Sequence, residues 1–299
     1  MNAKSKTVPV QIWHRARNYL GTWEKHHLIF NSLTIAMVII FVGKSLESSL
    51  LGNLQLLTTS MATIGIVAAG QTLVIITGGI DLSVASVVGM TGMITAYLAT
   101  IGIYPIGKFN PWLAAGIALL AATAVGWING VLVSRYKLAP FIATFGMLNL
   151  LRGAVGLLSN GTPINLRSDA FDWMWTRIFG IVPVPSLILL LVFVIIAYLL
   201  KNSRYGRYAY VIGSNETVAY LSGVNIERTC QVIYATSGFL AGLSGLLLPS
   251  LIKGGAYQNG QYYELFSIAA VIIGGTSLRG GTGGVGNPGR RSVDGDDQE

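Results

Sequence analysis

The stretch LQLLTTSMATIGIVAAGQTLVIITGGIDLS, residues 54–83, decides the class of fold. Its first part, residues 54–77, holds no charged side chain, and the chain then reaches the glycine pair Gly78-Gly79 and a lone acid, Asp81. A helix of about 20 mostly apolar residues is long enough to cross the roughly 30 Å hydrocarbon core of a bilayer. The stretch therefore predicts a transmembrane helix that is broken at its end by glycine.

The composition of the whole chain favours the same class. Of the 299 residues, 52% are hydrophobic and 11% are charged, whereas about 25% of the residues of an ordinary soluble domain are charged. Between Glu47 and Asp169 the only acidic residue is Asp81. Because a soluble protein of this size needs charged residues over its whole surface, we predict an all-α fold, a polytopic bundle of membrane helices.

The apolar runs predict about eight membrane spans within a transmembrane domain of residues 28–284. The predicted spans are Leu28–Val42, Leu54–Thr77, Val84–Thr100, Trp112–Val133, Pro140–Leu158, Ser186–Leu200, Thr229–Leu251 and Leu265–Leu278. Residues 1–27 form a basic N-terminal segment, and residues 285–299 form a polar tail. Several spans are short, which suits tilted or re-entrant segments as well as full spans.

The formal charge of +8 lies in short clusters of lysine and arginine between the apolar runs. Such clusters are typical of charges that orient a membrane protein, and not of a nucleic-acid-binding face. With the N-terminus in the cytoplasm, twelve cations before the tail fall on the cytoplasmic side and five fall on the outer side. Since cytoplasmic loops carry the excess of Lys and Arg, we expect a cytoplasmic N-terminus, contact with membrane lipid and no nucleic-acid partner.

Two glycine-broken segments stand in matching positions near the two ends of the domain. VIITGGIDLS covers residues 74–83 and VIIGGTSLRGG covers residues 271–281, so the two glycine pairs lie 196 residues apart. Interrupted apolar segments in corresponding halves are typical of transporters built from internal repeats. We therefore predict a possible internal repeat and place the candidate translocation and helix-break residues here. They are Gly78, Gly79, Asp81, Ser83, Gly274, Gly275, Thr276 and Ser277.

Asp81 has two interpretations. A carboxylate at this depth in a membrane is costly unless it faces protein, a helix end or water. It could cap the N-terminus of the following helix by accepting backbone N–H bonds, or it could act directly in the translocation pathway or its gating. The sequence leaves both open.

The longest predicted cytoplasmic loop is SRYGRYAYVIGSNETVAYLSGVN, residues 203–225. The run Ser214-Asn215-Glu216, followed by residues 217–221, is typical of a capped short amphipathic helix, which would end at Gly223. The apolar side chains Val218, Ala219 and Leu221 could dock into the groove of a partner protein. The same helix could instead rest on lipid headgroups.

No motif for chemistry on a substrate is present. The sequence lacks a P-loop, an HExxH motif, a Cys/His ligand cluster and a GxSxG elbow, so we expect no catalytic residue, no metal and no cofactor. The predicted spans also lack the paired acids that ion-coupled carriers often use. A transporter driven by a separate protein is favoured, and the alternative is a self-contained secondary carrier or channel for a small polar solute.

Four segments, GQTLVIITGGIDLSVAS, INGVLVSRYKLAPFIATFGMLNLLRG, GRYAYVIGSNETVAYLSGVN and ELFSIAAVIIGGTSLRGG, are together similar to the membrane permeases of bacterial ribose-type ABC importers. That family takes up ribose, xylose, arabinose, galactose and related sugars. The resemblance covers about residues 53–284. It implies a non-catalytic subunit of the bacterial plasma (inner) membrane with three partners: a second permease, a cytoplasmic ABC ATPase and an extracytoplasmic sugar-binding protein.

The resemblance also assigns a role to the cytoplasmic loop, which would be the segment that contacts the ATPase. The residues that carry over are Arg207, Gly213, Asn215, Glu216, Ala219, Ser222 and Gly223. The sequence departs from the family pattern at Thr217, where the family usually has a second Glu or similar polar residue, and at Ala85, where it commonly has Gly.

The tail GNPGRRSVDGDDQE, residues 286–299, is polar where the resemblance predicts further apolar helices. Codons that encode residues 286–298 can be chosen so that reading one base later gives GTLAGALWMVTI, an apolar segment. We therefore predict a single-base frameshift that removed the last one or two helices.

Overall fold

The computed structural model describes residues 50–166, 168–178 and 182–285. The chain divides into two compact units, Met1–Leu56 and Leu57–Glu299. Of the first unit, only residues 50–56 are described. The predicted N-terminal segment, the predicted span Leu28–Val42 and the tail from residue 286 lie outside the described residues.

The described residues are mostly helical. The helices are α2 (Leu50–Ile76), α3 (Val84–Thr100), α4 (Pro111–Ser134), α5 (Pro140–Leu158), α6 (Val184–Asn202), α7 (Arg204–Ser214), α8 (Glu216–Leu221), α9 (Ile226–Ile252) and α10 (Tyr263–Ile273), with the 3-10 helix η1 (Asp169–Trp175). Two pairs of two-residue antiparallel strands complete the fold: β1 (Ile164–Asn165) with β4 (Gly254–Gly255), and β2 (Arg177–Ile178) with β3 (Val182–Pro183).

Among the described residues, five helices are long and apolar enough to cross a membrane, namely α2, α4, α5, α6 and α9. The prediction of an all-α polytopic membrane protein is confirmed. The predicted spans at Val84–Thr100 and Leu265–Leu278 are the shorter helices α3 and α10. Helix α10 has 11 residues, which rise about 16 Å, or roughly half of the hydrocarbon core. It does not span the membrane alone, because the chain turns at the glycine pair after Ile273.

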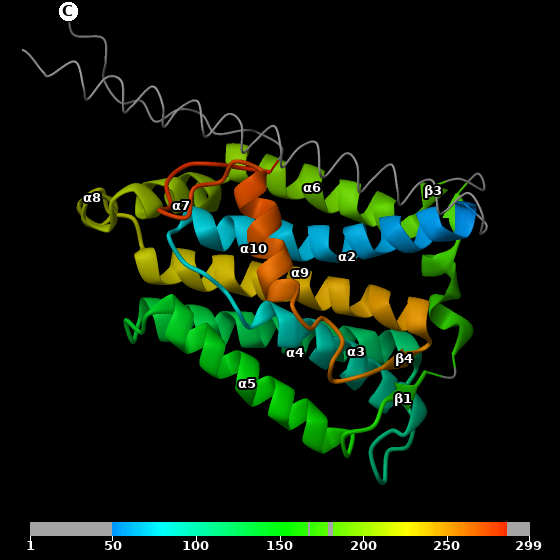
Figure 1. Ribbon diagram of the computed structural model, residues 1–299. Coiled ribbons are helices and arrows are strands. Elements are labelled where there is room, and N and C mark those ends of the chain that lie inside the picture. Colours follow the sequence, from blue (N-terminus) through cyan, green and yellow to red (C-terminus); the bar gives the residue numbers. More distant parts are fainter. Residues whose placement is uncertain (1–49, 167, 179–181, 286–299) are drawn as a thin grey trace, which may run out of the picture. The chain divides into compact units, whose positions relative to one another are not determined.

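Helix α9 lies between α2 on one side and α3 and α4 on the other (Figure 1). Helices α4 and α9 pack closely because each carries glycines at the contact. A Cβ at Gly126 would overlap the backbone carbonyl of Tyr234, and a Cβ at Gly238 would lie 2.5 Å from the carbonyl oxygen of Ala122. Small residues let membrane helices approach to backbone contact, which explains the close packing of α4 on α9.

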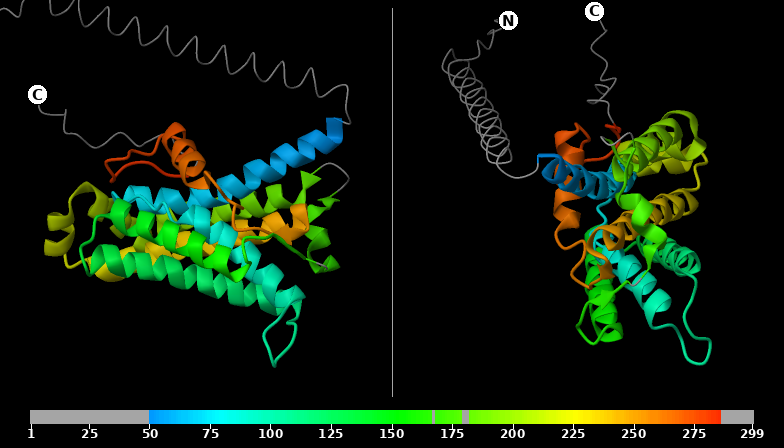
Figure 2. Two further views of the ribbon diagram at one scale, coloured as in Figure 1. Left: turned by 60° about the horizontal axis from the view of Figure 1, so that its bottom comes forward. Right: turned by 90° about the vertical axis from the view of Figure 1, so that its right-hand side faces the viewer.

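The two ends of the bundle have different character (Figures 1 and 2). One end carries α7, α8 and the short loop between α4 and α5. The other end carries the small strands, where the Lys253 ammonium pairs with the Asp172 carboxylate. We call the first the α8 end, and the functional segments lie there.

Candidate functional site: a glycine junction beneath a short surface helix

The first predicted break ends helix α2 in a left-handed turn at Gly78, where φ is +82°. The Gly78 amide donates to the carbonyl of Ile75 (2.8 Å), and the Gly79 amide donates to the carbonyl of Val74 (3.1 Å). These two bonds form a Schellman motif, in which the residue after the helix takes the left-handed conformation that glycine adopts without strain. The motif satisfies two carbonyls that the helix end would leave unpaired.

The second break repeats this motif. Gly275 has φ +89°, its amide donates to the carbonyl of Ile272 (2.9 Å), and the Thr276 amide donates to the carbonyl of Val271 (3.2 Å). Residue 78 therefore corresponds to residue 275, a spacing of 197. The glycine pairs themselves lie 196 residues apart, and the structural correspondence is shifted by one residue because the left-handed glycine is the first of the first pair and the second of the second pair. The internal repeat itself stays a prediction.

The structure brings the two breaks into direct contact. The amide of Gly281 donates to the carbonyl of Ile76 (2.9 Å), the last residue of α2. Helix α7 also takes part in this contact, since its Tyr210 hydroxyl donates to the carbonyl of Gly283 (2.7 Å). A Cβ at Gly213 would overlap the Ile76 carbonyl oxygen and lie 2.5 Å from the Gly281 nitrogen. We call this contact the glycine junction, made by residues 76–79, 210–214 and 276–284.

Asp81 lies in the loop between α2 and α3 and is 1% exposed. Its Oδ1 accepts hydrogen bonds from the Ser83 amide (3.0 Å) and the Ser83 hydroxyl (2.6 Å), and its Oδ2 accepts one from the Ser237 hydroxyl of α9 (3.3 Å). The side-chain amide of Gln71, with its nitrogen toward the Asp81 carbonyl, makes two bonds of 3.2 Å to the Asp81 backbone. Both carboxylate oxygens therefore face protein donors.

A second set of polar contacts fixes the same loop. The Asn129 side-chain amide of α4 donates to the Ser83 hydroxyl oxygen (2.8 Å). The Thr144 hydroxyl of α5 accepts from the Leu82 amide (3.1 Å), donates to the Pro140 carbonyl of its own helix (2.8 Å) and lies 3.2 Å from the Ile80 carbonyl oxygen. The N-cap of α3 is Ser83, so Asp81 holds the turn before the helix and is not itself the cap residue. The geometry favours a structural role, and the gating interpretation stays a prediction.

The predicted short helix is present as α8, whose N-cap is Asn215. The Asn215 Oδ1 accepts from the amides of Thr217 (2.9 Å) and Val218 (3.1 Å). Ala219 is 0% exposed and packs with Ile212 and Val224. The prediction that Ala219 could dock into a partner protein is therefore wrong. The six-residue helix α8 packs against the rest of the protein through this small side chain.

The outward side chains of α8 are larger. Val218, Tyr220 and Leu221 are 51%, 73% and 79% exposed. We call these three side chains the α8 patch. Isolated exposed apolar residues are ordinary, but three of them on six residues at the end of a bundle indicate a surface that another molecule covers.

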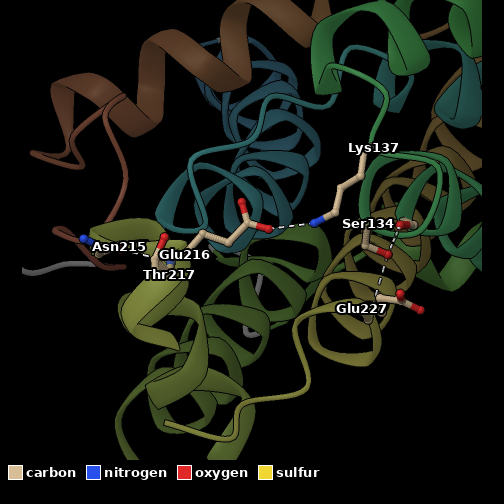
Figure 3. A network of polar contacts seen from close by, with 7 residues as sticks. Ser134, Lys137, Asn215, Glu216, Thr217 and Glu227 are labelled. Carbon is tan, nitrogen blue, oxygen red and sulfur yellow. Dashed lines mark hydrogen bonds and ion pairs between the residues drawn. The ribbon is translucent and has the colours of Figure 1, made fainter. Parts of the chain in front are cut away.

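An ion pair ties α8 to the loop between α4 and α5 (Figure 3). The Lys137 Nζ donates to the Glu216 Oε1 at 2.7 Å, and the two side chains are 64% and 58% exposed. The hydrogen bond to Glu216 raises the pKa of Lys137. Nearby, the Ser134 hydroxyl contacts the Glu227 carbonyl at the start of α9 (3.4 Å). The first contact ties α8 to the α4–α5 loop, and the second ties the end of α4 to the start of α9.

The comparison with known proteins agrees with this architecture. The family described as "Branched-chain amino acid transport system / permease component" matches residues 53–285. The chain belongs to this permease family. It is 34% identical to the ribose import permease protein of Bacillus subtilis over 280 residues, which cover 93% of this chain and 84% of the relative.

Two further relatives show similar identity. The chain is 36% identical to the ribose import permease protein of Escherichia coli K12, over 84% of this chain and 78% of the relative. It is 33% identical to the fructose import permease protein of Rhizobium meliloti, over 84% of this chain and 70% of the relative. No solved structure is significantly similar to the chain.

The remaining predicted residues of this permease fall around the junction and α8. Arg207 in α7 donates from Nη1 to the Asn202 carbonyl (3.2 Å). Ser222 is the C-cap of α8, and Gly223 follows it with φ +76° and open space around its Cα. The Thr276 Oγ1 accepts from the Gly284 amide (3.3 Å), and the Ser277 amide donates to the Thr282 carbonyl (3.2 Å). These contacts fold the segment after α10 back onto the junction.

The sequence interpretation missed the side chains that hold the Asp81 loop. They are Gln71, Asn129, Thr144 and Ser237, all buried. The available signal was a polar residue within each apolar span, because buried polar groups in membrane helices are costly and are usually hydrogen-bonded. Within the described parts of the chain, no three His, Cys, Asp or Glu side chains gather as metal ligands do.

Exchanging the charges of the Lys137–Glu216 pair tests its role in this permease. We expect Glu216→Arg to leave the fold intact, since an exposed pair stabilises by only about 0–1 kcal/mol, and to reduce transport by up to about fivefold through repulsion of Lys137. The double variant Glu216→Arg with Lys137→Glu should recover transport. The measurement is solute uptake at matched membrane expression. A double variant as impaired as Glu216→Arg would show that the Glu216 carboxylate acts on something other than Lys137.

Proposed function

We propose that the chain is the transmembrane permease subunit of an ATP-binding-cassette importer in the bacterial inner membrane, and that it carries a monosaccharide. The observation that carries the proposal is the similarity over most of the chain to permeases named for ribose and fructose import. The family description names branched-chain amino acids, but these individual relatives, at 33–36% identity, favour a sugar.

The proposed orientation places the α8 end in the cytoplasm. Cations gather there on segments that the fold brings together: Lys137 pairs with α8, Arg204 and Arg207 lie on α7, and Arg228 lies in the first turn of α9. Cytoplasmic loops carry the excess of Lys and Arg. A cytoplasmic α8 end fits the proposed position of the ATPase.

The proposed contact with a cytoplasmic ATPase is made by α7 and α8. The α8 patch offers an apolar surface of the size that a groove on a partner can receive. The glycine junction is connected to α8 through α7, the helix before it, because Gly213 and Tyr210 of α7 touch the segments of both helix breaks. A movement of α8 driven by ATP hydrolysis would therefore be transmitted to the helix breaks through α7.

Polar substitutions in the α8 patch test this contact. We expect Leu221→Asp to reduce ATP-dependent transport about tenfold or more, because a charge buried at a protein interface without a partner is costly. Folding should be unaffected, since Leu221 is 79% exposed. The measurements are co-purification with the ATPase and uptake. Ile106→Asp in the loop between α3 and α4, also an exposed apolar residue (71%) outside the membrane helices, is the matched control and should keep ATPase binding. Normal co-purification of Leu221→Asp would contradict the proposed contact.

A second permease copy is proposed to cover helix α5. Its exposed face carries Asn149 and the open glycines Gly146 and Gly153 among large apolar side chains such as Leu150. The exposed face of α6 around Leu190 and Val194 is apolar and contains no glycine. An amide that faces lipid is costly and small residues suit close helix contact. Gly153→Cys in a Cys230→Ser background should cross-link two copies in membranes. Val194→Cys is the control, and equal cross-linking of both would contradict an α5 interface.

Uptake by a reconstituted system tests the function. The full chain is expressed with a partner ABC ATPase and a partner binding protein in cells unable to take up ribose, fructose or arabinose, and labelled sugars and leucine are supplied in turn. We expect uptake of one sugar, dependent on ATP hydrolysis. Uptake of leucine alone would replace the proposed substrate, and sugar uptake by the chain alone in liposomes would establish a self-contained carrier or channel.

A further inference from the structure

A cavity of ≈ 320 Å³ lies between α8 and the first glycine break. Its walls come from the break itself, the loop between α4 and α5, α7, α8 and the first turns of α9. The lining residues used below are Gly79, Lys137, Ile212, Glu216, Cys230 and Tyr234. The proposed docking surface does not include this space, because Val218, Tyr220 and Leu221 do not line it.

A buried hydroxyl without a partner is part of the cavity wall. Tyr234 is 1% exposed, and its hydroxyl forms no hydrogen bond within the described chain. A Cβ at Gly79 would lie 2.5 Å from this hydroxyl oxygen, so glycine at this position keeps the space beside the hydroxyl open. Buried hydroxyls are nearly always paired. An unpaired one that lines a cavity is suited to pairing with a bound molecule.

The opposite side of the cavity presents one cation and one anion. Lys137 and Glu216 pair at 2.7 Å and are more than half exposed, so the cavity is open to solvent on their side. The ammonium has three donors and the carboxylate has about four acceptor sites, and a single bond between them leaves both groups with free capacity. Because the pair is neutral, it favours a neutral ligand that both donates and accepts over an anion or a cation.

Most of the remaining lining is apolar. It includes Ile212 of α7, Cys230 of α9 and the aliphatic residues of the α4–α5 loop, together with the hydroxyl residues Thr77 and Ser134. A few separated polar groups on an apolar lining are typical of small-molecule sites, and a volume near the lower end of roughly 300–1,000 Å³ suits a small ligand. The C–H faces of a sugar ring would meet the apolar wall, while its hydroxyls would reach Tyr234 and the ion pair.

We propose that this cavity binds a neutral polyol of monosaccharide size from the α8 side. The proposal rests on the proposed function for the identity of the ligand, which is the transported sugar after its release toward the cytoplasm. A sugar held there lies against Gly79 and beneath Glu216 of α8. It would therefore oppose movement of α8 toward the break, so accumulated sugar would slow its own import.

The single cysteine of the chain, Cys230, provides the measurement. The full chain in lipid nanodiscs is treated with methyl methanethiosulfonate, and the rate of Cys230 modification is measured with D-ribose, D-fructose or L-arabinose at millimolar concentration. One of the sugars is expected to slow modification several-fold. In Tyr234→Phe, which keeps the ring and removes only the unpaired hydroxyl, about three- to tenfold more sugar should be needed, the change that one lost hydrogen bond causes.

Two controls make the result specific. Tyr263→Phe changes a partly buried tyrosine, whose hydroxyl lies 3.1 Å from the Thr63 hydroxyl and outside this cavity, and should leave protection unchanged. Glycine betaine at matched osmolality should not protect Cys230. Protection by none of the three sugars, equal protection by betaine, or unchanged protection in Tyr234→Phe would each overturn the proposal.

A transport assay distinguishes a failure of the cavity site from a failure of the proposed function. Vesicles containing the permease with its ATPase and binding protein are assayed first without internal sugar, which tests the function alone, and then with internal sugar. Internal sugar should slow uptake in the unmodified chain, and Tyr234→Phe should relieve this inhibition. Uptake without inhibition by internal sugar would sink the cavity site and leave the function standing. Cysteine protection without any sugar uptake would sink the function and keep a polyol site.

Discussion

Replacing Gly213 by alanine is expected to abolish transport and to destabilise the folded permease. A Cβ at this position overlaps the carbonyl oxygen of Ile76 and crowds the Gly281 amide, the two groups whose hydrogen bond joins the helix breaks. The backbone must move, since neither contact is a flexible side chain. Overpacking costs about 1–3 kcal/mol and the lost hydrogen bond about 0.5–1.5 kcal/mol more.

The measurements are thermal unfolding in detergent and uptake at matched expression. The combined cost corresponds to a fall in melting temperature on the order of 5–15 °C. Gly116→Ala in α4 is the matched control, because Gly116 is also helical but a Cβ added there would have no neighbour within 4 Å. That change should be neutral or slightly stabilising, since alanine favours helix by about 0.5–1 kcal/mol over glycine. Equal behaviour of the two variants would contradict a tight junction.

The membrane class and most helices could be predicted from the sequence, because a helix that crosses the hydrocarbon core of the bilayer needs a long run of apolar residues. Helices α4 and α5 begin within one residue of the predicted Trp112 and Pro140, since Pro111 and Pro140 mark the first helical turns. The two helix breaks were also predictable, because paired glycines after an apolar run suit the left-handed turn that ends a helix.

The contacts between the segments were not predictable in the same way. The bond from Gly281 to Ile76 joins residues more than two hundred positions apart, and nothing in either local pattern indicates the other. The burial of Ala219 was missed because a helix of fewer than two turns shows no reliable periodicity. The close packing of α4 on α9 did have a signal. GWING, residues 126–130, and GFLAG, residues 238–242, both read GxxxG, a spacing typical of helix contacts in membranes.

Asp81 shows both what the sequence predicts and what it does not. Its position after the helix break was evident from the sequence, but its hydrogen-bond partners were not. A carboxylate after a helix break suggests either a structural turn or a group in the pathway. In the structure, three donors from Ser83 and Ser237 point at its oxygens, and Gln71 holds its backbone. Its surroundings therefore resemble a closed polar network, in which removing one member leaves the others unsatisfied.

Two substitutions of Asp81 are expected to have opposite outcomes. Asp81→Leu leaves the Ser83 amide and the hydroxyls of Ser83 and Ser237 without an acceptor, and each unsatisfied buried group costs about 1–3 kcal/mol. We expect this variant to be degraded or unfolded. Asp81→Asn keeps an oxygen for both Ser83 donors and offers an amide N–H to the Ser237 hydroxyl oxygen, so it should fold and retain most transport.

The asparagine variant decides between the two roles because it keeps the shape and the hydrogen-bonding capacity of the side chain while removing its charge. Its melting temperature and its uptake are measured together with those of Asp81→Leu. Normal stability with uptake close to that of the unmodified chain would establish that Asp81 acts through its hydrogen bonds to the turn before α3. Normal stability with uptake reduced about tenfold or more would show that the charge itself is needed, since a barrier change of 1.36 kcal/mol already gives that factor. In that case the structural interpretation fails and Asp81 belongs to the translocation pathway or its gate.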